Sequence, residues 1–255
     1  MFQERQFRPY WFETGTPTFL IKLLTQRRQY TPALENLMAP ETLLSTFDVD
    51  TIPTEALMFQ AGYLTIDHAE YIPGMTEISL RYPNLEVRTA LNGALLQALT
   101  GDPSRYARQI SGIYRLLQAN DLAGLRELFH AFFAGIPHDW HRNNPIAQYE
   151  GYWASVFYSH FAALGLDIVL EDVTNQGRID MAVRMNGQTW LFEFKVVELV
   201  PQGKAIEQLR DKGYAEKYRA AGPVHLVGVE FSKESRNIVG FETETLGETV
   251  ARVPV

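Results

Sequence analysis

Hydrophobic and polar positions alternate most regularly in residues 177–196, where two short runs of alternating side chains follow one another. Strict alternation predicts β-strands, because successive side chains on a strand point to opposite faces. Asn186-Gly187 lies between the two runs, and this dipeptide favours a type I′ turn, whose two central residues need positive φ. The stretch therefore predicts a β-hairpin. On its second strand Glu193 and Lys195 share one face, roughly 6.6 Å apart along the strand.

Further elements of the second half follow from the same kind of pattern. Short apolar runs predict strands at residues 167–173 and 224–231, and residues 237–242 predict an edge strand. Apolar side chains at helical spacing predict a helix from about residue 144 to 163 and another over residues 202–220. The predicted order in this half is helix, strand, strand, strand, helix, strand.

The first half is predicted to be mostly helical. Three apolar stripes at helical spacing predict helices over residues 83–135. Upstream of these, helices are predicted to start near residues 16, 40 and 53. Two strands are predicted at residues 63–66 and 77–82. Two short helices followed by a β-hairpin are the pattern of a winged helix.

Composition limits the function classes. The chain has 255 residues, of which 46% are hydrophobic and 21% charged, as in ordinary globular proteins. It has no cysteine, which excludes disulfides and thiolate metal sites. No apolar run approaches the roughly 20 residues that span a bilayer, so we expect no membrane association and a cytoplasmic location. The net charge of −7 argues against a broadly basic nucleic-acid surface and leaves room for a local basic groove.

The candidate chemistry lies on the predicted hairpin. An acid and an amine on one face of an otherwise apolar hairpin are costly unless they have partners or a function. Asp180 on the first strand adds a second carboxylate beside Glu193 and Lys195. Carboxylate and carbonyl oxygens are the ligands that hard cations such as Mg²⁺ take. The alternative is a structural Glu/Lys ion pair within a sheet.

Gly177-Arg178-Ile179-Asp180 followed by Phe192-Glu193-Phe194-Lys195 resembles the PD-(D/E)XK nuclease superfamily, in the form found in members fused to AAA-ATPase-like proteins. The resemblance implies an α/β (α+β) fold, with a restriction-endonuclease-like αβββαβ domain after a helical, winged-helix-like region. It implies a hydrolase that cuts DNA with Mg²⁺ or Mn²⁺. Asp180, Glu193 and the carbonyl of Phe194 would bind the metal, and Lys195 would hold the attacking water or the phosphate.

The resemblance extends to residues around the hairpin. Glu150, on the helix before it, corresponds to an additional metal ligand, although an acid near a helix N-terminus is also favoured by the macrodipole. Gln208 and Tyr214 match a Gln and a Tyr that the superfamily presents toward its site, Gln208 as an assisting catalytic residue and Tyr214 as a substrate contact. Arg178 would neutralise Asp180 or contact a phosphate. Lys212 would also bind substrate, the alternative being a solvated, salt-bridged helix face.

A second resemblance concerns residues 7–20, which are similar to the C-terminal end of an AAA-ATPase-like domain. No Gly-x-x-x-x-Gly-Lys-[Ser/Thr] phosphate loop occurs in the sequence, so we expect no ATP binding by this chain. The predicted organisation is an ATPase remnant at residues 1–25, a winged-helix-like linker at 26–137 and the nuclease-like domain at 138–255. Because the winged-helix-like stretch within residues 25–82 has few Lys or Arg residues, a structural or protein-contact role is favoured for it over DNA binding.

The sequence thus predicts a Mg²⁺-dependent phosphodiesterase acting on DNA, as the effector part of a longer ATPase–nuclease protein. The alternative is a catalytically inert nuclease-like fold that serves as a protein-interaction or regulatory module. The expected partners are accordingly DNA and either a protein or the missing ATPase portion.

Overall fold

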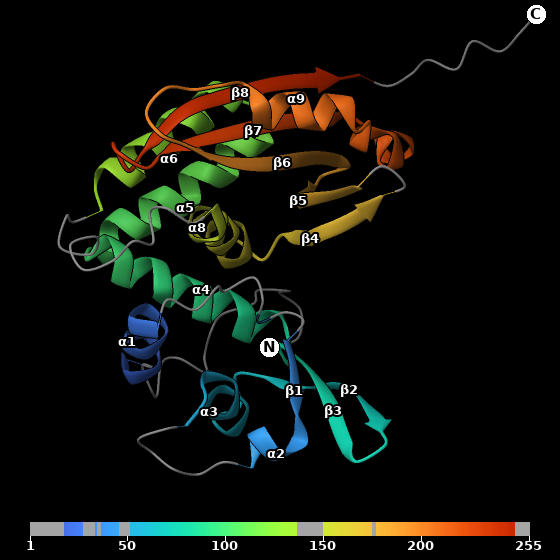
Figure 1. Cartoon of the computed structure of the whole chain (residues 1–255). Helices are drawn as coiled ribbons and strands as arrows, with labels where there is room; N and C mark the ends of the chain where they lie inside the picture. The colour runs from blue at the N-terminus through green and yellow to red at the C-terminus, as the bar shows by residue number, and fades with distance from the viewer. Residues whose placement is uncertain are drawn as a thin grey trace, which may run out of the picture.

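The computed structural model describes residues 18–27, 34, 37–45, 52–136, 150–174 and 177–247. The protein is of mixed α+β class, as predicted, and contains two β-sheets that lie at opposite ends of the molecule (Figure 1). A five-stranded sheet has the order β4-β5-β6-β7-β8 and a three-stranded sheet the order β1-β3-β2. This architecture is consistent with a restriction-endonuclease-like fold for the second half of the chain.

The five-stranded sheet confirms the predicted hairpin. Its strands are β4 (Asp167–Thr174), β5 (Gly177–Met185), β6 (Gln188–Val197), β7 (Val224–Ser232) and β8 (Ile238–Leu246). Neighbouring strands are antiparallel except β6 and β7, which are parallel and joined through helix α9 (Lys204–Asp211). At the hairpin turn Asn186 has φ 51° and Gly187 has φ 74°, the positive values that a type I′ turn needs.

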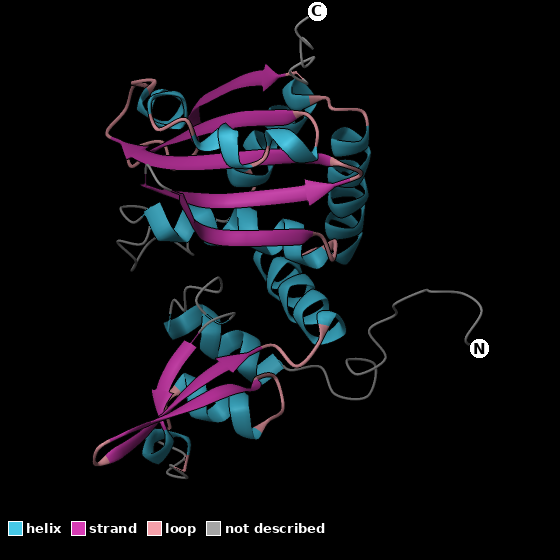
Figure 2. Ribbon diagram, turned by 90° about the vertical axis from the view of Figure 1, so that its right-hand side faces the viewer, coloured by secondary structure: helices cyan, strands magenta, loops and turns pink. Residues whose placement is uncertain are grey.

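Helices cover both faces of this sheet. Figure 2 shows α9 on one face and the longer helices on the other. On the latter face Phe192 and Phe194 pack against α8 (Glu150–Ala163), with 5.2 Å between the ring centroids of Phe157 and Phe194 and also between those of Phe161 and Phe192. The alternation of β6 therefore separates two cores, one under α6 (Leu122–Ala134) and α8 and one under α9.

Helix α4 (Leu85–Thr100) connects the two ends of the molecule. It begins at Asn84, whose Oδ1 accepts a hydrogen bond of 2.9 Å from the backbone N–H of Val87, as N-capping residues do. It packs against α8, and Arg88 donates a hydrogen bond of 2.7 Å to the carbonyl of Leu166, just before β4. The helix α5 (Pro103–Gln118) follows and packs on α6. The predicted helices over residues 83–135 are confirmed.

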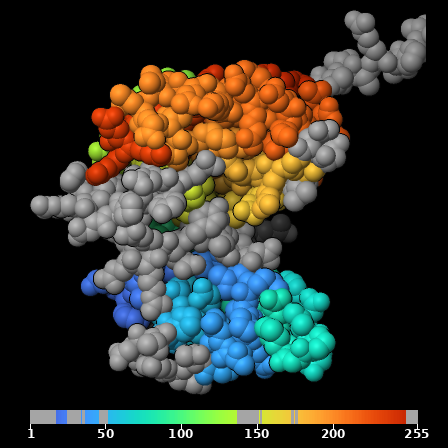
Figure 3. All heavy atoms as spheres, viewed as in Figure 1, coloured from blue at the N-terminus to red at the C-terminus, as the bar shows by residue number. Residues whose placement is uncertain are grey.

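The three-stranded sheet belongs to a separate hydrophobic cluster. Its elements are α1 (Thr18–Arg27), β1 (Leu37–Pro40), α2 (Glu41–Leu44), α3 (Thr54–Gln60), β2 (Thr65–Ile72) and β3 (Met75–Arg81). Figure 3 shows this part, coloured blue to blue-green, below the yellow to red C-terminal part. The sequence missed β1, a four-residue strand that β3 pairs with. The winged-helix assignment stays a prediction.

Two further outcomes concern the predicted elements. A single helix over residues 202–220 was wrong, because α9 ends at Asp211 and two short 3₁₀ turns follow Gly213, whose φ is 57°. Residues 7–17, which resemble an ATPase end, lie outside the described residues, as do residues 137–149. No helix in the described part of the chain combines the length and the apolar character that crossing a membrane requires.

Candidate functional site

Asp180, Glu193 and Lys195 are brought together by the pairing of β5 with β6. Asp180 Oδ2 accepts a hydrogen bond of 2.9 Å from the backbone N–H of Phe194, so the carboxylate reaches across to the neighbouring strand. Lys195 Nζ lies 3.1 Å from Glu193 Oε1. The expectation that Glu193 and Lys195 share a face is therefore confirmed. Lys195 comes two residues before the end of β6, so the group lies near the C-terminal end of the central strand of the sheet.

The three side chains differ in their exposure to solvent. Glu193 is 1% exposed, Lys195 is 28% exposed and Asp180 is half-buried. Burial raises the pKa of Asp180, because removal from water disfavours a carboxylate. The Phe194 N–H and the charge of Lys195 act in the opposite direction, and the net shift is upward. A cation bound beside such a desolvated carboxylate stabilises its charged form.

Glu171 on β4 is a third acid near this group. It has a positive φ of 47° and its Oε2 accepts a hydrogen bond of 2.7 Å from Arg178 Nη1. The charge of Glu171 contributes to the raised pKa of Asp180, and Arg178 counters it. Arg178 thus forms an ion pair with Glu171, whereas the sequence suggested Asp180 or a phosphate as its partner. Both side chains are 60% exposed, so the pair lies at the solvent edge of the site.

The α9 segment covers the same sheet face as the site. It packs so closely on β7 that a Cβ at Gly228 would lie 2.4 Å from the backbone nitrogen of Ile206, which only glycine avoids. Gln208 is half-buried on this helix, and Lys212 is exposed directly after it. Tyr214 is 2% exposed and packs in the core beneath the segment, with its hydroxyl against Gly177 at the start of β5. The substrate-binding roles of Lys212 and Tyr214 stay predictions.

Sequence analysis did not single out Glu230, which is 2% exposed on β7. It is the register partner of Lys195 on the parallel strand β6. Its carboxylate accepts hydrogen bonds from the backbone N–H groups of Gln202, Lys204 and Ala205, at distances of 2.5, 2.7 and 3.4 Å. It therefore holds the turn that leads into α9. One signal was available, since Glu230 is the single acid within an otherwise apolar run of β7.

The oxygen atoms of this group are of the kind that bind a hard divalent cation. Asp180 and Glu193 supply carboxylate oxygens and Phe194 a backbone carbonyl, and Mg²⁺ completes such a partial shell with water. Among the described residues, no three acids or histidines cluster closely enough to hold a metal. The side chain of Glu150, the fourth predicted ligand, lies outside the described part of the structure. The ligand roles therefore stay predictions.

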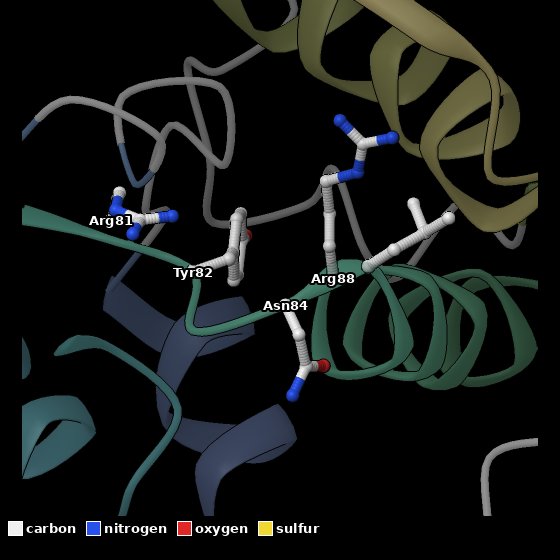
Figure 4. A pocket seen from close by; sticks show the side chains of 5 residues that line it. Arg81, Tyr82, Asn84 and Arg88 are labelled. Carbon is white, nitrogen blue, oxygen red and sulfur yellow. The ribbon is translucent and has the colours of Figure 1, made fainter.

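A pocket of about 290 Å³ lies away from this group, between β3 and α4. It is lined by Arg81, Tyr82, Asn84, Leu85 and Arg88 (Figure 4). Its basic residues are already engaged, because Arg81 Nε lies 2.7 Å from Asp67 Oδ1 and Arg88 binds the Leu166 carbonyl. The pocket thus lies at the junction of the two ends of the molecule and not at the paired carboxylates.

Comparisons with known proteins found a similar curated protein and a matching nuclease superfamily. A curated protein of Azotobacter chroococcum mcd 1, described as an uncharacterized protein in the vnfD 5' region, is 64% identical over 248 residues. The alignment covers 97% of this chain and 48% of that protein, so the chain spans about half the length of the curated relative it matches. No solved structure matches the chain. Residues 148–241, which contain Asp180, Glu193 and Lys195, match the PD-(D/E)XK nuclease superfamily, which points to a nuclease or another phosphodiesterase.

Proposed function

We propose that the chain is a Mg²⁺- or Mn²⁺-dependent nuclease acting on DNA, with its site at Asp180, Glu193 and Lys195. The observation that carries the proposal is the meeting of these groups on one face of the sheet, through the Phe194–Asp180 hydrogen bond and the Lys195–Glu193 contact. The match of residues 148–241 to a nuclease superfamily supports it.

The burial of the two acids supports a cation between them and the substrate. Asp180 has a raised pKa and Glu193 is 1% exposed, so both carboxylates are removed from most of the water that would screen their charge. Asp180, Glu193 and the carbonyl of Phe194 would hold the metal. A bound divalent cation lowers the pKa of its water and stabilises the charge that develops on a phosphate.

The protein's own groups would orient the reaction. The Phe194 N–H fixes one oxygen of Asp180, which leaves the other carboxylate oxygen for the cation. Lys195 is a compact cation with 28% of its side chain exposed, so its ammonium can hold the attacking water or an unbridged phosphate oxygen. Gln208, on the helix over the same face, would assist. Arg178 and Lys212 are exposed cations that would contact flanking phosphates.

The proposal includes a place for the rest of the chain. In this arrangement the winged-helix-like part links the nuclease site to an ATPase-like portion, which residues 7–20 resemble. The order of the described elements, helix, strand, two helices and two strands, supports a winged helix. The alignment covers 48% of the curated relative, so that protein has a further portion beyond the aligned region.

The test combines metal binding with cleavage. Titration with MnCl₂ in a calorimeter should give a site that Asp180→Asn weakens strongly, and plasmid nicking should require the metal. Lys195→Ala should keep metal binding and lose nicking, because the ammonium orients the nucleophile and does not ligate the metal. Glu70→Gln, an exposed acid on β2, is the control and should change neither. Binding and nicking that survive Asp180→Asn would overturn the proposal.

One observation favours the alternative function, a nuclease-like fold kept as an interaction module. Glu193 is nearly sealed from solvent and lies 3.1 Å from Lys195, as in a structural ion pair. If that reading holds, Lys195→Met combined with Glu193→Gln should preserve the stability of the protein, because buried ion pairs are often replaceable by neutral groups. The same titration with MnCl₂ would then show no site in the parent chain.

A further inference from the structure

The connection between β6 and α9, residues 198–203, exposes two consecutive large aliphatic side chains. Leu199 is 54% exposed and Val200 is 69% exposed. The loop follows β6 directly, and Leu199 is four residues beyond Lys195. Since an extended chain advances about 3.3 Å per residue, the backbone of these two residues lies within about 13–17 Å of the backbone of Lys195. They follow the C-terminal end of β6, the central strand that carries Glu193 and Lys195.

The beginning of this loop is held firmly by the turn between β7 and β8. The Lys233 N–H donates a hydrogen bond of 3.0 Å to the Val197 carbonyl, and Ser232 Oγ donates one of 2.8 Å to the Glu198 carbonyl. Lys233 Nζ also lies 2.7 Å from Glu198 Oε1. These contacts fix the chain just before Leu199.

The end of the loop is held by Glu230. This buried carboxylate accepts the backbone N–H groups of Gln202 and Lys204, on either side of Gly203. Gly240 leaves the space for this contact, because a Cβ there would lie 3.2 Å from both Glu230 Oε2 and Pro201 Cβ. Leu199 and Val200 are therefore presented to solvent by a loop that is clamped on both sides. An apolar contact made by a fixed loop loses little conformational entropy on binding.

We propose that Leu199 and Val200 contact the base and sugar surfaces of a nucleotide beside the scissile phosphate. This inference rests on the proposed function and adds to that site an apolar contact with the substrate. The net charge of −7 limits what phosphate contacts alone can contribute to binding. Aliphatic side chains of DNA-binding proteins can contact or wedge between bases, and such a contact does not release counterions. The contribution of Leu199 and Val200 to the affinity should therefore be nearly the same at low and at high salt.

The variant that tests the loop is Leu199→Ser with Val200→Ser. Its matched control is Tyr71→Ser with Ile72→Ser, an equally adjacent apolar pair on β2 that is 80% and 37% exposed. The probes are a fluorescein-labelled 20-nucleotide single strand and the corresponding duplex, with Ca²⁺ in place of Mg²⁺ to suppress cleavage. Fluorescence anisotropy should show at least about a tenfold loss of affinity for the loop variant, from the apolar area it no longer buries. The control should stay within about twofold of the parent.

Two further readouts decide the interpretation. The fold-loss of affinity in the loop variant should be the same at 50 and 200 mM NaCl. Whichever probe, single strand or duplex, shows the larger loss identifies whether unpaired or paired bases are contacted. Parental affinity in the loop variant, an equal loss in the control, or no binding of either probe by the parent would overturn the inference. Turnover of bis(p-nitrophenyl) phosphate with Mn²⁺ tests the proposed function separately, because this small diester has no base. Absent turnover with the expected loss of affinity would reject the cleavage and keep the loop contact.

Discussion

The inner strands β6 and β7 of the large sheet and the β2–β3 hairpin of the small sheet hold acidic residues in opposite environments. In the five-stranded sheet Glu193 and Glu230 are 1% and 2% exposed and each has specific partners. In the three-stranded sheet Glu70 is exposed on β2 and lies directly across from Glu77 on β3, an arrangement of like charges that only solvent makes tolerable. A carboxylate is removed from water and bound by protein groups where helices on both sides of the sheet exclude solvent, as around β6, and stays solvated where they do not.

Replacing Asp180 should give the largest effect that separates the two sheets. Asp180→Ala removes a desolvated metal ligand, and we expect cleavage to fall at least about a thousandfold, or roughly 4 kcal/mol of transition-state stabilisation. Glu77→Ala on the small sheet should leave the rate unchanged. The measurement is the single-turnover rate of plasmid nicking with Mg²⁺. Equal losses in the two variants would remove the distinction between the sheets.

Truncation of a core aromatic comes next. Phe192 is fully buried between the sheet and Phe161, so Phe192→Ala should cost about 3–5 kcal/mol of unfolding free energy through the cavity it leaves. Tyr71→Ala on β2 removes a ring that is 80% exposed and should change stability by no more than about 0.5 kcal/mol. Urea unfolding followed by tryptophan fluorescence compares the two. A similar midpoint for both variants would contradict the different burial of the sheets.

Lowering the pH should destabilise the helical layer over the large sheet. His160 is 1% exposed, lies among Phe129 and Phe132, and its Nδ1 is 2.7 Å from the Val156 carbonyl. Burial lowers its pKa to about 4, against about 6.5 in an unfolded chain. Between these values the unfolded state binds more protons, so stability falls as the pH drops from 6.5 toward 4.

The loss at pH 4 should approach about 3 kcal/mol, since one pKa unit corresponds to roughly 1.4 kcal/mol. His160→Gln should remove this part of the pH dependence, measured as the difference in urea midpoint between parent and variant at each pH. Burial also lowers the pKa of His225, so the parent's total slope reports more than one histidine. Parallel curves for parent and variant would show that His160 does not titrate in this window.

The smallest expected effect is at the surface of the site. Arg178 and Glu171 are 60% exposed, and exposed ion pairs contribute at most about 1 kcal/mol. Arg178→Ala should therefore leave the unfolding midpoint nearly unchanged while raising KM for DNA more than it lowers kcat, because a phosphate contact is lost. The matched change Arg236→Ala, on the turn between β7 and β8, should affect neither. A large loss of stability in Arg178→Ala would make this residue structural.

Local sequence pattern was sufficient for much of the second half. The alternation of residues 179–195 and the Asn186-Gly187 turn are short-range features, and the hairpin formed as they predict. The same holds for the helices over residues 83–135, which the apolar stripes predict. Pattern failed where the chain departs from regular geometry, as at Gly213, and where β1 is too short to show a period.

By itself, therefore, the sequence determined the hairpin, the helices over residues 83–135 and the placement of Glu193 and Lys195 on one face, because these depend on neighbours within a few residues. Only the tertiary structure decided that Asp180 bonds across to Phe194, that Arg178 pairs with Glu171, and that Glu230 holds the entry to α9. These contacts join residues on different strands or loops. Their partners and their degree of burial depend on which elements exclude water from them, and no local pattern encodes that exclusion.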